Sequence, residues 1–501
     1  MKNQVERWGV FEVRVDGPQE GNPFVEHHFW GIFRGKNETV QADGFYDGDG
    51  VYKVRFMPSF EGAYTYETDG DFSAAQTTGE FFVSPPGDGN HGPVRVANTY
   101  HFAYEDGTPY YSVGTTCYVW TMQPEAVRQK TLEELSKGYF NKMRFCVFPK
   151  HYIHNFRDPE TFPFEGTPVD NTGLSEENFS YNVDFSGNDW DFTRLNPEHF
   201  RRLEQAILEL QTRGIEADII VMHPYDRWGF SAMPREADDL YWNYVIARFA
   251  AYRNVWWSLA NEYDLLRAKT LEDWEHYAAL LCEKDPYKHL RSVHNCVAFY
   301  DYTRPWVTHC SMQRQDLYRH VEYTDDYRTR YGKPVVWDEI AYEGNLDMGW
   351  GNISGQELTR RFWEAALRGG YAGHGETFAD PEHDILWWSH GGALHGESPA
   401  RIRFLYQILT ETPGLGLKRG AGSFDEIVGV PEIGDSGAYE IHYYGFGRPS
   451  FRDFHKDDRA SYRVEVIDTW NMTVEDAGVH SGKFRIALPG REYMAVRIRR
   501  I

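Results

Sequence analysis

The chain has 501 residues, of which 41% are hydrophobic and 25% are charged, a soluble globular composition long enough for two or three domains. Its net charge of −23 argues against nucleic acid as a partner, because phosphate binding depends on clustered Lys and Arg. No run of about 18 apolar residues occurs, so the sequence predicts no membrane span.

The amino terminus and the cysteines bear on the cellular compartment. Residues Met1 to Glu6 lack the apolar core of a secretory signal. The five cysteines are odd in number, widely spaced and without a Cys-x-x-Cys pair, and they are Cys117, Cys146, Cys282, Cys296 and Cys310. We interpret them as reduced thiols of a cytoplasmic protein, with a trimmed signal peptide or a metal site as the alternatives.

The first part of the chain, residues 1–91, alternates short apolar runs with glycine-rich turns. Strands are predicted at residues 8–15, 25–33, 51–57, 63–68 and 80–83, which together indicate a small β-sandwich of the immunoglobulin-like kind. Residues 84–90, rich in Pro and Gly, indicate a linker. We expect a structural domain that packs on the next one, and independent sugar binding is the alternative.

Residues 92–412 change to strands that alternate with helices, the pattern of a parallel sheet with crossover helices. Asn196-Pro197 begins one helix with a cap and an N1 proline, and Thr270-Leu271-Glu272-Asp273 begins another. Eight strands are predicted, at residues 110–114, 142–148, 215–222, 254–260, 291–294, 306–310, 334–337 and 370–373. Eight such units predict a (β/α)8 barrel with long loops.

Alternation returns in residues 413–501, with runs at 438–444, 461–468 and 493–501. These runs predict a second β-sandwich. The expected fold class is therefore α/β, with a central (β/α)8 TIM barrel flanked by two β-sandwich domains.

Two of the predicted barrel strands end in carboxylates. The bulky run Trp256 to Ala260 turns into Asn261-Glu262, and Val335 to Trp337 is followed by Asp338-Glu339. Barrel enzymes build their sites at the carboxyl ends of the strands, so Glu262 and Glu339 are a candidate catalytic pair. Other polar or aromatic side chains near strand ends are candidate substrate ligands: Arg144, His223, Asp226, Arg227, Trp228, Asn261, His309, Tyr342, Glu376 and Trp387.

At these residues the sequence resembles a known group. Asn261-Glu262 at the fourth strand and Glu339 at the seventh resemble the acid/base and the nucleophile of the large clan of retaining (β/α)8 glycoside hydrolases. The order of sandwich, barrel and sandwich resembles the apiosidase-like glycoside hydrolases of bacteria over nearly the whole chain. Gly44-Phe45-Tyr46-Asp47-Gly48 resembles the leading sandwich of that group, and Asn141-Lys142-Met143-Arg144-Phe145 resembles the clan's second strand.

The resemblance implies roles for individual residues. Asn261 would hold the sugar hydroxyl beside the anomeric carbon, and Arg144 would keep Glu339 ionised. The eighth strand departs from the clan, where an aromatic floor is usual, because Gly373-His374-Gly375-Glu376 offers a third carboxylate. This departure bears on the substrate subsite.

The chemistry can also be argued without the family. Cleavage of a glycosidic bond with retention needs one protonated carboxyl and one ionised carboxylate about 5.5 Å apart. The apolar neighbours Trp256 and Trp257 favour the neutral form of Glu262, and a neighbouring Arg144 favours the charged form of Glu339. We therefore expect a retaining glycoside hydrolase that needs no cofactor and acts on an oligosaccharide or small glycoside. A homo-oligomer is compatible with the sequence.

Three alternatives stay open. The stretch His223 to Trp228 either positions substrate hydroxyls or braces a long loop. A non-catalytic carbohydrate-binding protein on a degenerate barrel would share the same fold. A metal-dependent barrel hydrolase is suggested by several histidines, but Thr115-Thr116-Cys117-Tyr118 lacks the His-x-His of such enzymes; the histidines are His151, His154, His383, His390 and His395.

Long loops bear on substrate length. Lys150 to Asp191, Pro224 to Ala237 and Asp384 to Glu397 follow predicted strands and are long enough to wall the barrel top into a pocket. We therefore expect cleavage of a short glycoside from its non-reducing end. The alternative is that these loops pack on the sandwiches and leave an open cleft.

Overall fold

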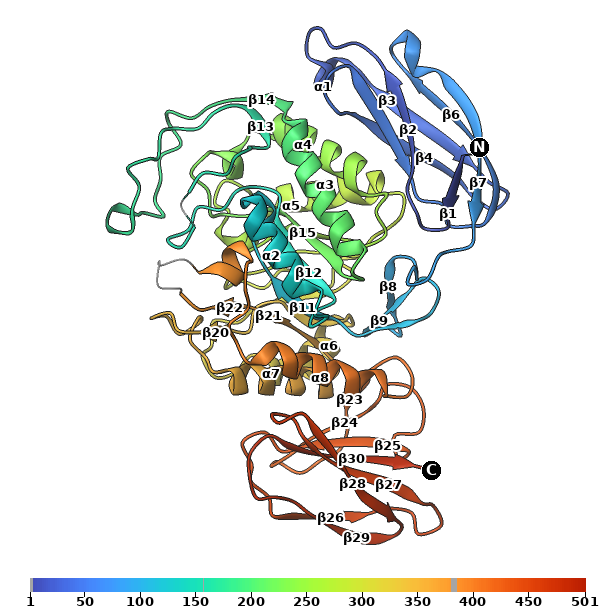
Figure 1. Ribbon diagram of the computed structural model, residues 1–501, viewed down its shortest axis with the longest axis vertical. Helices are drawn as coiled ribbons and strands as arrows, with labels where there is room; N and C mark the ends of the chain where they lie inside the picture. The colour runs from blue at the N-terminus through green and yellow to red at the C-terminus, as the bar shows by residue number, and fades with distance from the viewer. Residues whose placement is uncertain (1–2, 156, 380–384) are drawn as a thin grey trace. The chain divides into compact units, whose positions relative to one another are not determined.

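The structure is a computed structural model that describes residues 3–155, 157–379 and 385–501. Its internal contacts divide the chain into two compact units, and Figure 1 shows their elements. The first comprises Met1–Val94, Tyr118–Arg128 and Arg144–Val293, and the second comprises Arg95–Cys117, Gln129–Met143 and His294–Ile501. These units do not coincide with the three predicted domains, whose boundaries stay a prediction.

The first unit begins with a seven-stranded sheet in the order β1-β7-β6-β3-β4-β5-β2. Its elements are β1 (Gln4–Glu6), β2 (Phe11–Asp16), α1 (Pro23–Glu26), β3 (Phe29–Arg34), β4 (Thr39–Tyr46), β5 (Val51–Phe56), β6 (Gly62–Gly70) and β7 (Thr77–Ser84). Phe11 on β2 stacks on Phe81 of β7 with ring centroids 3.8 Å apart, although these strands are far apart in the sheet order. The sheet therefore folds over into two layers around an aromatic core.

The predicted strands of this part differ from the structure at α1, β1 and β4. Val25 lies in the short helix α1, because Asn22 caps it and Pro23 occupies its first turn. The edge strand β1 and the strand β4 were not predicted. β4 contains Gly44, which a turn prediction favours but which here lies close to Phe29 of the neighbouring strand β3.

The folded sheet packs on two helices of the same unit, α3 (Pro197–Gln211) and α4 (Arg235–Phe249). Arg55 on β5 forms an ion pair with Glu204 of α3 and donates a 2.7 Å hydrogen bond to the Arg248 carbonyl of α4. Arg248 in turn lies 2.8 Å from Asp47, and all four side chains are buried or nearly so. Buried charges persist only when they are paired, so this network specifies how the sheet and the helices meet.

Four parallel strands of the first unit follow the order β17-β16-β15-β12. Every residue of β15 and β16 is buried, which agrees with strands covered on both faces. In α3, Asn196 caps the first turn and the stripe of Phe200, Leu203, Ile207 and Leu210 is buried, as predicted. The bounds are β12 (Lys142–Cys146), β13 (Phe164–Thr167), β14 (Asp189–Leu195), β15 (Glu216–Met222), β16 (Val255–Ala260), α5 (Leu271–Lys284) and β17 (Arg291–Ser292).

The second unit contains the parallel order β11-β21-β19-β18 and three helices. α2 and β12 span the division between the units. The bounds are β8 (Val94–Ala97), β9 (His101–Tyr104), β10 (Pro109–Tyr110), β11 (Val113–Thr116), α2 (Glu125–Leu135), β18 (Cys310–Met312), α6 (Thr324–Tyr331), β19 (Val335–Trp337), β20 (Glu343–Gly344), α7 (Gly355–Leu367), β21 (Tyr371–His374), β22 (Glu376–Thr377) and α8 (Ser398–Thr410).

The strand predicted at residues 306–310 was wrong. Val307 N donates to the Arg304 carbonyl at 3.1 Å, so this apolar run begins with a buried turn. The strand β18 starts only at Cys310, whose N–H donates to the Pro334 carbonyl at 2.9 Å. Burial alone cannot distinguish a packed turn from a strand.

The carboxyl-terminal part of the second unit has a six-stranded sheet, β23-β24-β25-β30-β27-β28, and the pair β26-β29. The predicted runs correspond to β25, β27 and β30. Phe454 of β26 and Ile486 of β29 share a buried cluster with Val464 and Val496 of the larger sheet, which forms a two-layer core. The bounds are β23 (Leu417–Arg419), β24 (Ile427–Pro431), β25 (Tyr439–Tyr443), β26 (Phe451–His455), β27 (Tyr462–Asp468), β28 (Thr473–His480), β29 (Lys483–Ala487) and β30 (Met494–Arg500).

No helix in the described residues has the length and apolar character required to cross a membrane.

Candidate active site

In the first unit, Glu262 follows the carboxyl end of β16 and is buried. Its backbone is left-handed, with φ 51° and ψ 55°. A non-glycine residue in this conformation costs about 1–2 kcal/mol, and such strain concentrates at functional sites. This left-handed turn at Glu262 ends the apolar run of β16 and places the Glu262 side chain beyond that run.

The side chains around Glu262 fix its orientation. Tyr225, from the loop after β15, donates a short hydrogen bond to Glu262 Oε2. The neighbouring Asn261 accepts a 2.9 Å hydrogen bond from Arg144 Nη2 on β12. Lys150 Nζ lies 4.4 Å from the Tyr225 ring centroid and 3.3 Å from that of Tyr118. The predicted residues Arg144, in β12, and Asn261 and Glu262, after β16, are thus brought together across the intervening strand β15.

In the second unit, Glu339 follows the carboxyl end of β19 at the end of a chain of polar contacts. Lys142 Nζ donates to Asp338 Oδ1 at 2.7 Å, and Ser311 Oγ donates to Asp338 Oδ2 at 2.6 Å. His294 Nδ1 lies 3.1 Å from Ser311 Oγ, and His294 Nε2 lies 3.3 Å from Glu339 Oε1. We call these five residues, Lys142, Asp338, Ser311, His294 and Glu339, the polar chain.

The donors of the polar chain determine where its protons lie. Ser311 has one hydroxyl proton, which it donates to Asp338, so it can only accept from His294 Nδ1. His294 Nε2 then meets the Glu339 carboxylate favourably only if it also carries a proton. A proton on His294 Nε2, 3.3 Å from Glu339 Oε1, is the arrangement that stabilises an ionised Glu339 carboxylate.

The stretch His223 to Trp228 is held by the protein itself. His223 Nε2 lies 3.2 Å from the Phe148 carbonyl, and burial together with Lys150 lowers the His223 pKa to about 3. Asp226 accepts backbone N–H bonds from Trp228, Gly229 and Ser231 at 2.7 to 3.2 Å, although burial raises its pKa. These contacts close the turn after β15.

The neighbouring side chains extend this bracing to the long loop at residues 150–191. Arg227 Nη2 and Trp228 Nε1 both donate to Asp158 Oδ1, at 2.6 and 3.0 Å. Arg227 and Trp228 are buried. Of the two interpretations of this stretch, these contacts favour loop bracing.

Two predicted aromatic residues, Tyr342 and Trp387, follow β19 and β22 of the second unit. Tyr342 packs on Gly375, where an added Cβ would come within 2.2 Å of the tyrosine ring, and it contacts Trp350 and Trp388. Trp387 instead donates a 2.8 Å hydrogen bond to Thr115 Oγ1 and packs near Phe140. Trp388, rather than Trp387, thus shares the aromatic cluster with Tyr342.

Glu376 on β22 is a buried carboxylate. It accepts the backbone N–H groups of His395 and of Gly396, the latter at 2.8 Å. Burial, with a smaller contribution from Glu343, raises its pKa to about 7. The carboxylate therefore anchors the segment that leads into α8.

His309 lies at the amino-terminal end of β18, whereas Glu339 follows the carboxyl end of the parallel strand β19. Burial lowers the pKa of His309 to about 3, and the His309 ring contacts Phe102. The prediction that placed His309 at a strand's carboxyl end was wrong, because β18 begins at Cys310, four residues later than expected.

The histidines do not gather into a metal site in the part of the chain that the structure describes. There, no group of three or more His, Cys, Asp or Glu side chains is arranged to hold a metal ion. His383 lies outside the described residues.

Comparison with known proteins identifies the group. The family model described as the apiosidase-like catalytic domain matches residues 96–393, more than half of the chain. The chain belongs to the apiosidase-like family. Two further models, both described as domains of unknown function (DUF5060 and DUF5605), match residues 4–71 and 429–499 of this apiosidase-like protein. No curated protein matches it.

Solved structures agree with this assignment. A Bacteroides vulgatus protein, described as a candidate glycoside hydrolase, is 35% identical, with both chains covered completely and a TM-score of 0.91. A family 5 glycoside hydrolase from the same organism is 15% identical over 82% of this chain and 93% of its own, with a TM-score of 0.61. The apiosidase-like chain is therefore a glycoside hydrolase with a (β/α)8 barrel fold.

Several site residues of the apiosidase-like chain were missed. His294 ends a predicted strand, so the strand-end rule that found Glu262 could have found it. Ser311 was missed because its strand was misplaced. Lys142 and Asp338 are 196 positions apart in the sequence, and only the structure shows that they pair.

Proposed function

We propose that this apiosidase-like protein is a retaining glycoside hydrolase in which Glu339 is the nucleophile and Glu262 is the acid/base. The observation that carries this proposal is the polar chain on Glu339. A side chain that must attack an anomeric carbon has to be ionised and correctly oriented, and a ring nitrogen at 3.3 Å favours both when it carries a proton.

The first step is glycosylation. Glu339 attacks the anomeric carbon and forms a bond to it, while the bond to the leaving oxygen breaks and Glu262 gives that oxygen its proton. In the second step Glu262 takes a proton from water, the water oxygen bonds to the anomeric carbon, and the Glu339 carboxylate leaves. Tyr225 fixes the orientation of Glu262 in both steps by its hydrogen bond to Oε2.

Asn261 is proposed to bind the sugar hydroxyl beside the anomeric carbon, oriented by Arg144. Tyr342 is proposed to line the sugar subsite together with Trp350 and Trp388. The hydrogen bonds of Asp226, Arg227 and Trp228 favour a role for these residues in fixing the loops. We propose the same structural role, in the walls of the site, for His223, Glu376 and Trp387.

We further propose exo action on short plant or microbial oligosaccharides. The loop at residues 150–191 is fixed by Asp158, and the segment at 395–398 is fixed by Glu343 and Glu376. Loops that are held in one position suit a substrate that is bound by one of its ends. In the third predicted loop, Asp384 to Glu397, the residue Asp384 lies outside the described residues. The odd number and wide spacing of the five cysteines support the proposal of a reducing, cytoplasmic environment.

A screen of aryl glycosides, pyranose and furanose, would identify the sugar. Proton NMR of the first product formed from the active glycoside then tests the mechanism. The proposal predicts that the newly released sugar keeps the anomeric configuration of the substrate, whereas an inverted first product would contradict it.

Product analysis on an oligosaccharide tests the exo proposal. Monosaccharide released from the first time point is expected. An early ladder of mid-sized products would mean an open cleft.

A further inference from the structure

The helix α7 of the second unit carries charged side chains on one face, which are Glu357, Arg360, Arg361 and Glu364. Their spacing is the one that usually places apolar residues against the core. Here Arg360, Arg361 and Glu364 are buried, and Glu357 is partly buried. Buried charges are costly unless they are paired, so the partners of these side chains indicate what this face of the helix holds in place.

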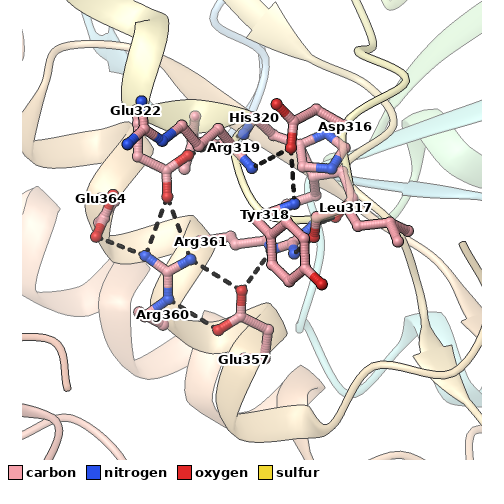
Figure 2. Close-up of polar contacts among 12 residues, drawn as sticks. Asp316, Leu317, Tyr318, Arg319, His320, Glu322, Glu357, Arg360, Arg361 and Glu364 are labelled. Atoms are coloured by element: carbon pink, nitrogen blue, oxygen red, sulfur yellow. Dashed lines mark hydrogen bonds and ion pairs between the residues drawn. The ribbon is translucent and has the colours of Figure 1, made fainter. Parts of the chain in front are cut away.

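Glu357 is shared by the two arginines, as Figure 2 shows. Its Oε1 accepts a hydrogen bond from Arg361 Nε at 2.7 Å and another from Arg360 Nη2 at 2.8 Å. Burial alone would raise the pKa of Glu357, but the hydrogen bonds and charges of Arg360 and Arg361 lower it below its usual 4.5. The ionised Glu357 carboxylate therefore orients both guanidinium groups.

The other acceptors of the two arginines differ in kind. Arg360 donates to further carboxylates, such as Glu364 at 2.5 Å. Arg361 instead donates to two backbone carbonyls, that of Ile340 from Nη1 at 2.5 Å and that of Leu317 from Nη2 at 3.0 Å. The first carbonyl lies after β19 and the second after β18, so one buried guanidinium joins the loops that follow two strands.

The Leu317 carbonyl belongs to a loop that is fixed by its own contacts (Figure 2). Asp316 Oδ1 accepts the backbone N–H groups of Tyr318 and Arg319 at 2.9 and 3.0 Å. These two bonds close a turn around Leu317. The loop after β18 therefore offers Arg361 an acceptor of fixed position, against which the guanidinium can hold the chain after β19.

The Ile340 carbonyl lies beside a strained residue. Ile340 directly follows Glu339, and the next residue, Ala341, has a left-handed backbone with φ 63°. A residue with a β-carbon is disfavoured in this conformation and keeps it only when its surroundings hold it there. On the other side of Ala341, the Tyr342 N–H donates to a backbone carbonyl at 2.7 Å. The strained turn between Glu339 and Tyr342 is thus held by a hydrogen bond on each side.

We propose that Arg361 is a positioning residue for the reaction. Its bond to the Ile340 carbonyl holds the turn at Ala341, and this turn sets the position of Glu339 relative to Tyr342. The inference rests on the proposed function, in which Glu339 is the nucleophile and Tyr342 lines the sugar subsite. Arginine suits this task because its rigid planar fork donates to two carbonyls and a carboxylate at once, whereas a lysine ammonium has no such fork.

The test compares Arg361→Lys with Arg360→Lys. Each variant keeps a positive charge beside Glu357 and loses a guanidinium, but only the first change removes the fork that bonds the residue after Glu339. The rate of labelling by a 2-deoxy-2-fluoro dinitrophenyl glycoside of the sugar found in the screen measures the first step.

Arg361→Lys should slow labelling roughly 10-fold to 100-fold, the scale of a small misplacement of a reacting group, and Arg360→Lys less than about threefold. Circular dichroism melts measure how much stability each variant loses. A merely structural role predicts that labelling slows in proportion to the fall in Tm in both variants, and that result would overturn the proposal.

A second change tests the turn itself. Glycine adopts the left-handed conformation without the steric cost of a β-carbon, so Ala341→Gly should favour the turn when the guanidinium no longer holds it. Added to Arg361→Lys, this change should speed labelling roughly fivefold, and added to Arg360→Lys it should give no such gain. No recovery in the Arg361→Lys background would overturn the role of the turn.

Hydrogen exchange separates this proposal from the proposed function, because it needs no substrate. The N–H groups of residues 340–344 should exchange roughly tenfold faster in Arg361→Lys than in the wild type, and at the wild-type rate in Arg360→Lys. This result in a protein that no glycoside labels would keep the support of the turn and refute the proposed function. A labelled wild type, with unchanged exchange and labelling in Arg361→Lys, would keep the proposed function and overturn the role of Arg361.

Discussion

The surroundings of Glu262 and Glu339 differ in kind. Glu262 contacts a neutral phenol, Tyr225, and has a strained left-handed backbone after an apolar strand. Glu339 faces His294, which is linked through Ser311 and Asp338 to the buried cation Lys142. A neutral neighbour allows a carboxyl to gain and lose a proton, whereas a cationic neighbour keeps it charged. The difference is the one that an acid/base and a nucleophile require.

The strongest test of this comparison removes the nucleophile. Glu339→Ala should abolish turnover on every substrate, a loss of roughly 10⁴-fold or more, because no covalent intermediate can form. Steady-state rates measure the loss, and circular dichroism checks that the variant is folded. Added azide should restore cleavage of an aryl glycoside and give a glycosyl azide of inverted configuration. Full activity on any glycoside would remove Glu339 from its role.

Glu262→Ala should affect substrates unequally. Natural glycosides should lose roughly 100-fold or more, since their leaving oxygen needs a proton, while the first step on an activated aryl glycoside should survive. Pre-steady-state bursts with 2,4-dinitrophenyl glycosides measure that first step. An equal loss on both substrate types would contradict the assignment of Glu262.

A smaller effect is expected when the polar chain is cut away from the reacting atoms. Ser311→Ala removes the acceptor for His294 Nδ1–H and should cost roughly 10-fold, as loss of an orienting partner does. The His294 ring then orients and supports ionised Glu339 less well, so the acidic limb of the kcat/KM profile should move to higher pH. An unmoved limb would remove the polar chain from this role.

Arg144→Met, on the Glu262 side, is the substitution to compare with Ser311→Ala on the Glu339 side. The family resemblance predicts that it also moves the acidic limb upward, whereas the contact of Arg144 with Asn261 predicts weaker substrate binding. If the acidic limb of the kcat/KM profile moves to higher pH in Ser311→Ala but not in Arg144→Met, then the polar chain, and not Arg144, keeps Glu339 ionised.

The smallest expected effect concerns stability beside the Glu262 strand. Burial raises the pKa of Glu216 to about 8, against a partial offset from the 3.0 Å hydrogen bond of Trp256 Nε1. Because this folded-state pKa lies above the usual 4.5, the stability that Glu216 contributes is complete below about pH 4.5 and is lost as the pH rises through about 8.

Glu216→Gln keeps an acceptor for Trp256 and removes the titration. Its Tm should therefore fall less than that of the wild type between pH 5 and 9, by a few degrees. Differential scanning calorimetry measures this, with the exposed Glu272→Gln as control. Parallel Tm curves for Glu216→Gln and the wild type would contradict the raised pKa.

The sequence predicted most of the fold because barrel strands contain bulky apolar runs, such as residues 219–222 of β15 and 255–257 of β16, with helix caps such as Asn196 between them. It failed at residues 306–309, where a buried turn has the same composition as a strand. The pair Glu262 and Glu339 could be proposed from the sequence because each follows an apolar run. The polar chain could not be predicted, since Lys142, His294, Ser311 and Asp338 come from four separate segments and only tertiary contacts join them.

The central claim is that Glu339 becomes covalently glycosylated. A 2-deoxy-2-fluoro glycoside of the sugar found in the screen, with a dinitrophenyl leaving group, slows the second step and should trap the intermediate. Peptide mass spectrometry then locates the label. A single sugar on the peptide that contains Glu339, absent from Glu339→Ala, is the predicted result. A label on Glu262 or Glu376, or turnover with no label, would contradict the account.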